Sequence, residues 1–123
     1  MNFPVNLKYT ASHEWMKDLG NGSFEIGITD YAQKELGDIV YVNLPKAGDA
    51  IKEGASFADV ESVKAVSDIL SPVNGSVREV NENILSSPEL INKEPYDSWF
   101  IRAEGSAGRA LLSAEEYEKE VGK

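Results

Sequence analysis

The residue whose setting best suits chemistry is Lys64, in the stretch Glu61-Ser62-Val63-Lys64-Ala65. Residues 56–61 and 66–70 on either side are rich in apolar and β-branched side chains, which predicts two strands joined by a tight turn. A tight hairpin holds its tip rigidly and clear of the body, so a modifying enzyme could approach Lys64. Most surface lysines are simply solvated. At this stage the residues alone therefore leave two interpretations open: a modified lysine and an ordinary exposed one.

A second polar cluster is formed by Ser12, His13 and Glu14, which precede Trp15. In the simpler interpretation this is a polar strand edge with Trp15 anchored in the core, and for His13 and Trp15 that interpretation is preferred. A functional role requires Glu14 to face a cationic group. Asp68 is subject to the same comparison, because aspartates near turns are commonly solvated or bonded to the local backbone.

Composition excludes several classes of function. The 123 residues include no cysteine and only one histidine, so disulfides, thiolate catalysis and a histidine-rich metal site are excluded. The net charge of −9 opposes binding to nucleic acid and to anionic lipid, and suits basic patches on protein partners. No nucleophile, base and orienting group converge in the sequence. We therefore expect a binding or carrier role, no catalytic residues and no metal site.

The elements that must position these residues are mostly short strands. Gly and Pro turns between alternating stretches predict a small β-rich fold closed on itself as a sandwich or barrel. Strands are expected at residues 7–10, 23–28 (half-buried), 38–44, 56–61, 66–70, 76–81 and 98–104. A short helix over 31–36, with Tyr31, Ala32 and Leu36 on its buried side, is expected between Thr29 or Asp30 as cap and Gly37 as stop.

Several local signals make sharper predictions. Asn74-Gly75 is the strongest turn signal of the chain, and Gly27 suggests a bulge or a close backbone approach. Ser87 as N-cap, Pro88 and Asn92 as stop predict one helical turn. Residues 105–108 read as a flexible break. Ser113 and Glu116 have capping-box spacing at the start of a helix over 113–121.

Taken together, these stretches closely resemble the H-protein family of the glycine cleavage system, whose members carry lipoate. The Glu-Ser-Val-Lys-Ala run at 61–65 is its most specific part, and the resemblance covers almost the whole chain. The matching segments are Tyr9 with 12–15, then 26–33, 36–40, 61–65, 67–69, 71–75 and 99–101.

The resemblance implies a mainly β fold, a barrel-sandwich hybrid of two small antiparallel sheets with short helices and a C-terminal helix. It implies one lipoyl-carrier domain over residues 1–123, with a core at about 7–104 and the helix at about 113–121. Lys64 would carry lipoate in amide linkage, and the arm would shuttle the aminomethyl group. Its partners would be glycine decarboxylase (with pyridoxal phosphate), the tetrahydrofolate-dependent aminomethyltransferase, dihydrolipoamide dehydrogenase and a lipoate-attaching enzyme.

In the family the arm docks through polar groups that correspond to Ser12, Glu14 and Asp68 here. Carboxylates can hold an ammonium group by charge-assisted hydrogen bonds. Some members have a histidine in the short helix near the arm, whereas this chain has Glu35 in that region and no histidine. The detailed chemistry of the cleft therefore stays open.

Alternatives are a protein that relays lipoyl groups to other carriers, a biotinyl domain and a plain interaction module. The biotinyl domain is disfavoured because valine and alanine, rather than methionines, flank Lys64. The N-terminal residues have neither a secretory signal nor an Arg-rich transit peptide. We expect a monomer in a bacterial cytoplasm, or in the mitochondrial matrix if this is a mature eukaryotic chain.

Overall fold

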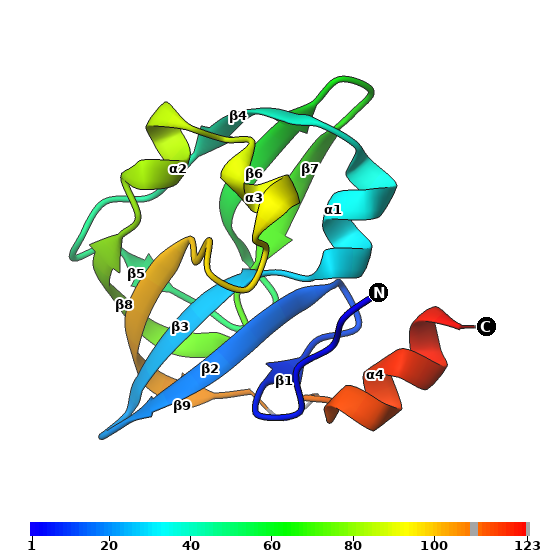
Figure 1. Ribbon diagram of the computed structural model, residues 1–123. Helices are drawn as coiled ribbons and strands as arrows, with labels where there is room; N and C mark the ends of the chain where they lie inside the picture. The colour runs from blue at the N-terminus through cyan, green and yellow to red at the C-terminus, as the bar shows by residue number, and fades with distance from the viewer. Residues whose placement is uncertain (109–110, 123) are drawn as a thin grey trace.

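The computed structural model describes residues 1–108 and 111–122 and consists mainly of two antiparallel sheets with short helices (Figure 1), which confirms the predicted fold class. The six-stranded sheet has the order β1-β2-β3-β9-β8-β5, and the three-stranded sheet has the order β4-β6-β7. The strands are β1 (Lys8–Tyr9), β2 (Glu14–Gly20), β3 (Ser23–Ile28), β4 (Ile39–Asn43), β5 (Ala50–Ile51), β6 (Ser56–Ser62), β7 (Val66–Leu70), β8 (Val73–Val80) and β9 (Ile101–Ala107). The helices are α1 (Asp30–Leu36), α2 (Asn83–Ser86), α3 (Leu90–Lys93) and α4 (Ala114–Val121).

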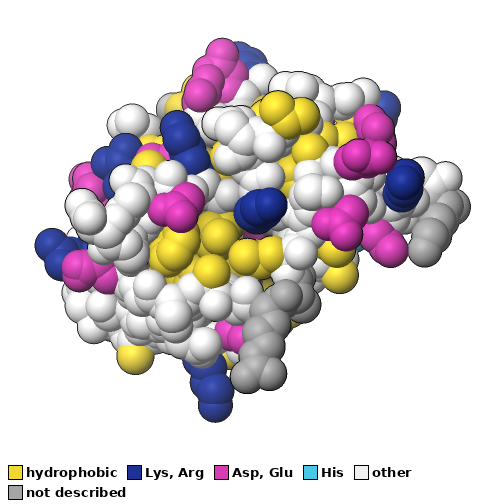
Figure 2. Space-filling model, turned by 90° about the horizontal axis from the view of Figure 1, so that it is seen from below, with side chains coloured by type: hydrophobic (Ala, Val, Ile, Leu, Met, Phe, Trp, Pro, Cys, Tyr) yellow, Lys and Arg dark blue, Asp and Glu magenta, His cyan; other side chains and the backbone are white. Residues whose placement is uncertain are grey.

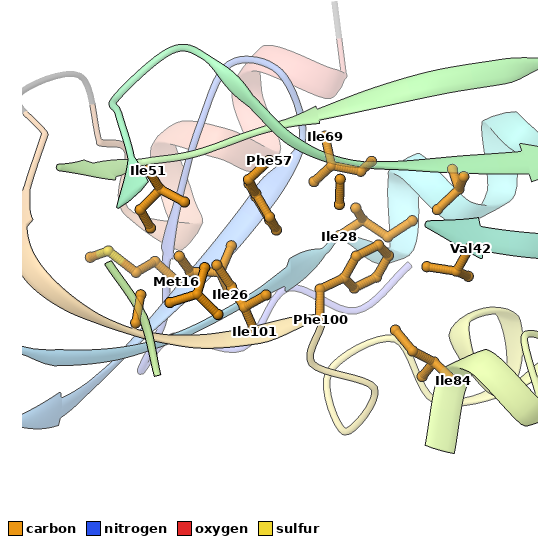
Figure 3. Packing of buried hydrophobic residues seen from close by; sticks show 14 of the residues in the cluster. Met16, Ile26, Ile28, Val42, Ile51, Phe57, Ile69, Ile84, Phe100 and Ile101 are labelled. Carbon is orange, nitrogen blue, oxygen red and sulfur yellow. The ribbon is translucent and has the colours of Figure 1, made fainter. Parts of the chain in front are cut away.

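The main hydrophobic core lies between the two sheets. Figure 3 shows Phe57 and Ile69 of the three-stranded sheet facing Ile26 and Ile101 of the six-stranded sheet, all of them buried. Ile84 of α2 closes one side of this core. Burial of these side chains holds the sheets together, because each buried aliphatic or aromatic side chain stabilises the fold by about 1.5–3 kcal/mol.

A second, smaller cluster attaches α4 to the body. Tyr117 of α4 is fully buried and stacks on Tyr9 of β1, with ring centroids 4.8 Å apart. The helix begins with the predicted capping box, in which the Ser113 hydroxyl accepts from the Glu116 N–H and the Glu116 carboxylate accepts from the Ser113 N–H. The aromatic stack and the cap fix the start of α4 against β1.

Strand β3 has the predicted bounds but is buried on both faces rather than half-buried. The reason is Gly27, which lies opposite Trp15 in a regular register with β2. A Cβ atom there would approach the Trp15 indole to 2.7 Å, so the absent side chain leaves room for the ring. Gly27 therefore marks the predicted close approach and no bulge.

The turn predicted at Asn74-Gly75 is wrong, because both residues lie inside β8. Gly75 pairs with Gly105 of β9, and a Cβ on either glycine would overlap the carbonyl oxygen of its neighbouring strand. The glycines thus serve close backbone contact between strands. The flexible break predicted at residues 105–108 is wrong for the same reason, since β9 continues to Ala107; its start is Ile101 rather than Ser98.

The short helices follow the sequence in part. Thr29 caps α1 through the Ala32 N–H, and Gly37 ends α1 with a φ of 78°, as predicted. The buried side expected for α1 is only half-buried, because it borders a cavity. The turn predicted from Ser87 becomes α3, which begins at Leu90 and contains Asn92. Helix α2 has no counterpart in the sequence prediction.

Candidate functional site

Lys64 lies at the exposed tip of the β6–β7 hairpin, as the sequence predicts. The Ser62 N–H donates to the Ala65 carbonyl at 2.8 Å, and the Ser62 hydroxyl accepts from the Ala65 N–H at 3.1 Å and the Lys64 N–H at 3.3 Å. The Val63 N–H donates to the Asp38 carbonyl at 3.0 Å. These bonds hold the tip in one conformation against the start of β4.

The side chain of Lys64 lies across the end of α1. A Cβ atom on Gly37 would lie 3.9 Å from Lys64 Cε and 3.8 Å from the Val63 side chain. Figure 1 shows the hairpin projecting above the body, beside the end of α1 where the chain enters β4. The amine is therefore presented next to the helix that lines the nearest cavity.

The first cavity lies between α1, β7 and the loop before β2, and has a volume of about 330 Å³. Ile28, Leu36 and Ile69 supply apolar wall, and the groups able to form hydrogen bonds are Ser12, His13, Tyr31, Glu35, Ser67 and Asp68. A second cavity of about 350 Å³ adjoins it and is lined by Thr10, Ser12, Glu14, Leu70, Pro72 and Leu111, among others. Ser12 lines both cavities and so stands between them.

Glu14 is buried, with 2% of its surface exposed, and its carboxylate accepts three hydrogen bonds. Oε1 accepts from the hydroxyls of Thr10 and Ser12, each at 2.6 Å, and Oε2 accepts from the Leu70 N–H at 3.3 Å. Burial raises the pKa of Glu14, and these hydrogen bonds oppose the rise. Glu14 is thus an internal carboxylate and not part of the exposed strand edge considered from the sequence.

Of the site residues expected from the sequence, the structure brings Ser12 and Glu14 into direct contact, with Ser12 Oγ 2.6 Å from Glu14 Oε1. Asp68 lies at the first cavity with Ser12, whereas Glu14 lines the second. The Asp68 side chain is exposed, because alternation along β7 places it on the outer face of the sheet, opposite Asp59 of β6.

His13 lines the first cavity, and its backbone is strained, with a φ of 77°. Its Nδ1 lies 2.8 Å from the Tyr117 hydroxyl, which in turn lies 2.8 Å from the Thr29 hydroxyl. Its ring packs on Tyr31 with centroids 4.8 Å apart. Burial lowers the pKa of His13, and the nearby Glu35 carboxylate opposes this shift. Trp15, by contrast, is a fully buried core residue, as expected.

Sequence reasoning missed two residues that hold this site in place, Thr10 and Tyr117. The Thr10 hydroxyl forms two hydrogen bonds with Glu14: it donates to Oε1 and accepts from the Glu14 N–H at 3.0 Å. Tyr117 reaches His13 from 104 residues away in the chain. The Thr10 contact is local, since the two residues are four apart, and a hydroxyl followed four residues later by a carboxylate could have signalled it. No local pattern signals the Tyr117 contact, because it depends on how α4 packs against the body.

The residues of the site can do three things. An exposed lysine amine can be acylated, the cavities offer apolar walls to a long apolar chain, and Ser12, Asp68 and Glu14 offer polar groups to its end. Among residues 1–108 and 111–122 there is no cluster of three potential metal ligands. None of the helices in the described part of the chain has the length and hydrophobicity of a membrane-spanning helix.

Comparisons with known proteins place this geometry in context. Residues 7–123 match the family model described as glycine cleavage H-protein. A protein of Halothermothrix orenii named glycine cleavage system H protein is 51% identical over 121 residues, covering 95% of this chain and 94% of the relative. A Listeria monocytogenes protein of the same name is 50% identical, covering 97% and 98%. The crystal structure of a glycine cleavage system H protein from Mycobacterium marinum superposes with a TM-score of 0.91 at 36% identity, covering 98% of this chain and 99% of the other.

Proposed function

The chain belongs to the glycine cleavage H-protein family, and from this premise we propose that Lys64 is the residue that carries lipoate, in amide linkage. The protein is a lipoyl carrier of glycine cleavage and not itself an enzyme. A relay role, or that of a plain interaction module, is not favoured, because the relatives are named for glycine cleavage.

The observation that carries the assignment of Lys64 is its presentation. The amine stands at a hydrogen-bonded, exposed tip, and its side chain lies across the end of α1, beside the first cavity. An acylating enzyme can therefore reach Nζ. The chain attached there would begin next to a cavity with apolar walls.

The site fits lipoate as a prosthetic group. Lipoate attached there would supply a dithiolane, whose disulfide can be reduced as one sulfur takes up the aminomethyl group that remains after glycine loses its carboxyl carbon. This chain lacks cysteine and has no thiol of its own. We assign Ser12, Asp68 and Glu14 to the cleft that holds the end of the arm, with Asp68 and Ser12 at the first cavity and Glu14 in the second. The walls would limit the access of water to that end.

The carrier interacts with other components of the glycine cleavage system. We assign these partners as the pyridoxal-phosphate glycine decarboxylase, the tetrahydrofolate-dependent aminomethyltransferase, dihydrolipoamide dehydrogenase and an enzyme that attaches lipoate. The H proteins of Halothermothrix and Listeria come from bacteria, which supports a bacterial cytoplasm as the location.

Intact mass of the protein from lipoate-replete cells tests the role of Lys64. We expect a lipoyl-sized increment that is absent from Lys64→Ala and retained in Lys46→Ala, an exposed lysine in the loop after β4. An unmodified wild-type mass would refute the proposal. Glycine–bicarbonate exchange reconstituted with the decarboxylase then tests the carrier role, because exchange should require the modified protein.

The cleft assignment has its own test. Glu14→Ala should leave lipoylation intact and shorten the lifetime of the aminomethylated carrier in water. The reason is that the variant lacks the internal carboxylate proposed to hold the end of the arm. Because removal of Glu14 also frees two hydroxyls, thermal unfolding of the variant must be measured alongside. An unchanged lifetime in a folded variant would remove Glu14 from the cleft.

A further inference from the structure

Large hydrophobic side chains are exposed around Lys64. Val63 and Val66 flank the tip with 68% and 69% of their surface exposed, and Val40 and Tyr41 of the adjacent strand β4 are 54% and 51% exposed. Four of the eight large hydrophobic residues exposed in the described chain therefore lie at this end of the three-stranded sheet; the others are Met1, Val5, Leu19 and Leu85.

The register explains why these side chains share a surface. Tyr41 pairs with Glu61, and Glu61 pairs with Val66, so the three form one row across the outer face of the sheet. A register shift between Ile39 and Tyr41 turns both Val40 and Tyr41 to solvent. We call the surface made by Val40, Tyr41, Glu61, Val63 and Val66 the hairpin face.

The border of the hairpin face is acidic. The next row of the sheet places Asp59 directly opposite Asp68, with Asn43 donating to Asp59 at 2.8 Å. Like charges directly opposite on a sheet cost the free protein stability. The ion pairs formed between described residues join β3, β8 and β9 or lie within α4, and none of them involves Asp59 or Asp68. The uncompensated aspartates suit a partner that brings lysine or arginine to this border.

We propose that the hairpin face is the docking surface for the enzyme that acylates Lys64, and that this enzyme presents apolar side chains to Tyr41 and Val66 and basic groups to Glu61 and the acidic border. The inference rests on the proposed attachment of lipoate to Lys64. An acylating enzyme must bring a carboxyl carbon to Nζ, so it must touch the side chains within a few residues of the tip. Enzymes that act on the far end of an arm do not require this contact.

Exposed hydrophobic surface alone does not single out this end of the molecule. The face seen from below in Figure 2 also gathers hydrophobic side chains near its centre, with acidic and basic side chains around them. The hairpin face differs in combining apolar exposure with a rigid lysine and an acidic border. Acylation of Lys64 removes the positive charge at its tip, so the docked enzyme meets a different surface before and after the reaction.

The test compares the double variant Tyr41→Ser/Val66→Ser with the control Leu19→Ser/Val5→Ser, which removes exposed hydrophobic side chains of β2 and the N-terminal segment. Binding of the unmodified protein to the lipoate-attaching enzyme is measured by calorimetry, and acylation of Lys64 by intact mass. We expect the hairpin-face variant to bind roughly tenfold more weakly or worse, as truncation of central interface residues does. The control should match wild type.

A second variant examines the border. Asp59→Asn should slow association with the attaching enzyme and reduce its dependence on salt, because charges at the rim of an interface act mainly on the association rate. Equal binding by the hairpin-face variant and wild type would overturn the proposal. So would a variant that is acylated normally but, once modified, fails only with the decarboxylase. Wild-type protein that is never acylated at Lys64 would instead refute the attachment itself.

Discussion

The hydroxyl of Tyr117 joins α4 to His13 of the cavity wall and to Thr29, the N-cap of α1, and removing it tests how the wall is supported. In Tyr117→Phe the aromatic ring can keep its stack on Tyr9, while the hydrogen bonds to His13 Nδ1 and Thr29 Oγ1, both 2.8 Å, are lost. Thr29 is fully buried and keeps its bond from the Ala32 N–H, whereas Nδ1 of half-buried His13 is left without this partner.

The expected magnitude follows from these contacts. A buried polar group left without its partner costs about 1–3 kcal/mol. Since Thr29 retains one bond, we expect a loss of about 2 kcal/mol in the free energy of unfolding. At about 4 °C per kcal/mol for a domain of this size, the melting temperature should fall by about 8 °C.

Urea unfolding and calorimetry measure this change, and Tyr41→Phe is the matched control. Tyr41 is half-exposed on β4, so removal of its hydroxyl should change stability by less than about 0.5 kcal/mol. A Tyr117→Phe protein as stable as the control would contradict the reasoning, because it would mean that the bonds to His13 and Thr29 contribute nothing net.

Two further predictions concern the same wall and the strand pairing. Because burial lowers the pKa of His13 from 6.5, the neutral ring stabilises the fold above that pH, and this contribution should be lost as the pH falls below about 6.5. In His13→Asn the new side chain tolerates the positive φ and does not titrate. The difference in free energy of unfolding between wild type and this variant should therefore shrink as the pH is lowered from 7.5 to 5.5. A constant difference would exclude His13 as the cause. Gly75→Ala places a Cβ against the Glu104 carbonyl and should lower the free energy of unfolding by more than about 3 kcal/mol. The control Gly48→Ala, whose Cβ meets open space, should lose only the strain of its positive φ. Near-equal unfolding midpoints of the two variants in urea would show that β8 and β9 can separate at Gly75.

The hairpin, β4 and α1 could be predicted because their signals are local. Alternating side chains specify β6 and β7. Thr29 begins α1 through its side-chain hydroxyl, and Gly37 ends it through a positive φ. Asn74-Gly75 misled because a glycine after asparagine favours a turn and also permits close contact between strands. Only the partner glycine, Gly105, distinguishes the two, and its pairing is not visible in the local sequence.

The residues proposed for the site come from the sequence, whereas their arrangement comes from the fold. Ser12 and Glu14 are two residues apart, so their contact is local, whereas the third bond to Glu14 comes from the Leu70 N–H, 56 residues away. That bond exists only because the two sheets pack face to face. The state of Glu14, buried and raised in pKa, is therefore a property of the fold.

With Ser12 and Glu14 assigned to the cleft as proposed, the arrangement also predicts the order in which they act. Because Thr10 and Ser12 already occupy Oε1 of Glu14, a cationic group reaching that carboxylate must share it with those hydroxyls or displace them. Ser12 is exposed and lines both cavities, so a group entering from the side of Lys64 meets Ser12 before it meets Glu14. Ser12→Ala should therefore weaken retention of the arm in the cleft. Glu14 should keep its hydrogen bonds from Thr10 and from the Leu70 N–H in this variant. Loss of retention in Glu14→Ala alone, with Ser12→Ala unchanged, would reverse this order and make Glu14 the first polar group of the cleft.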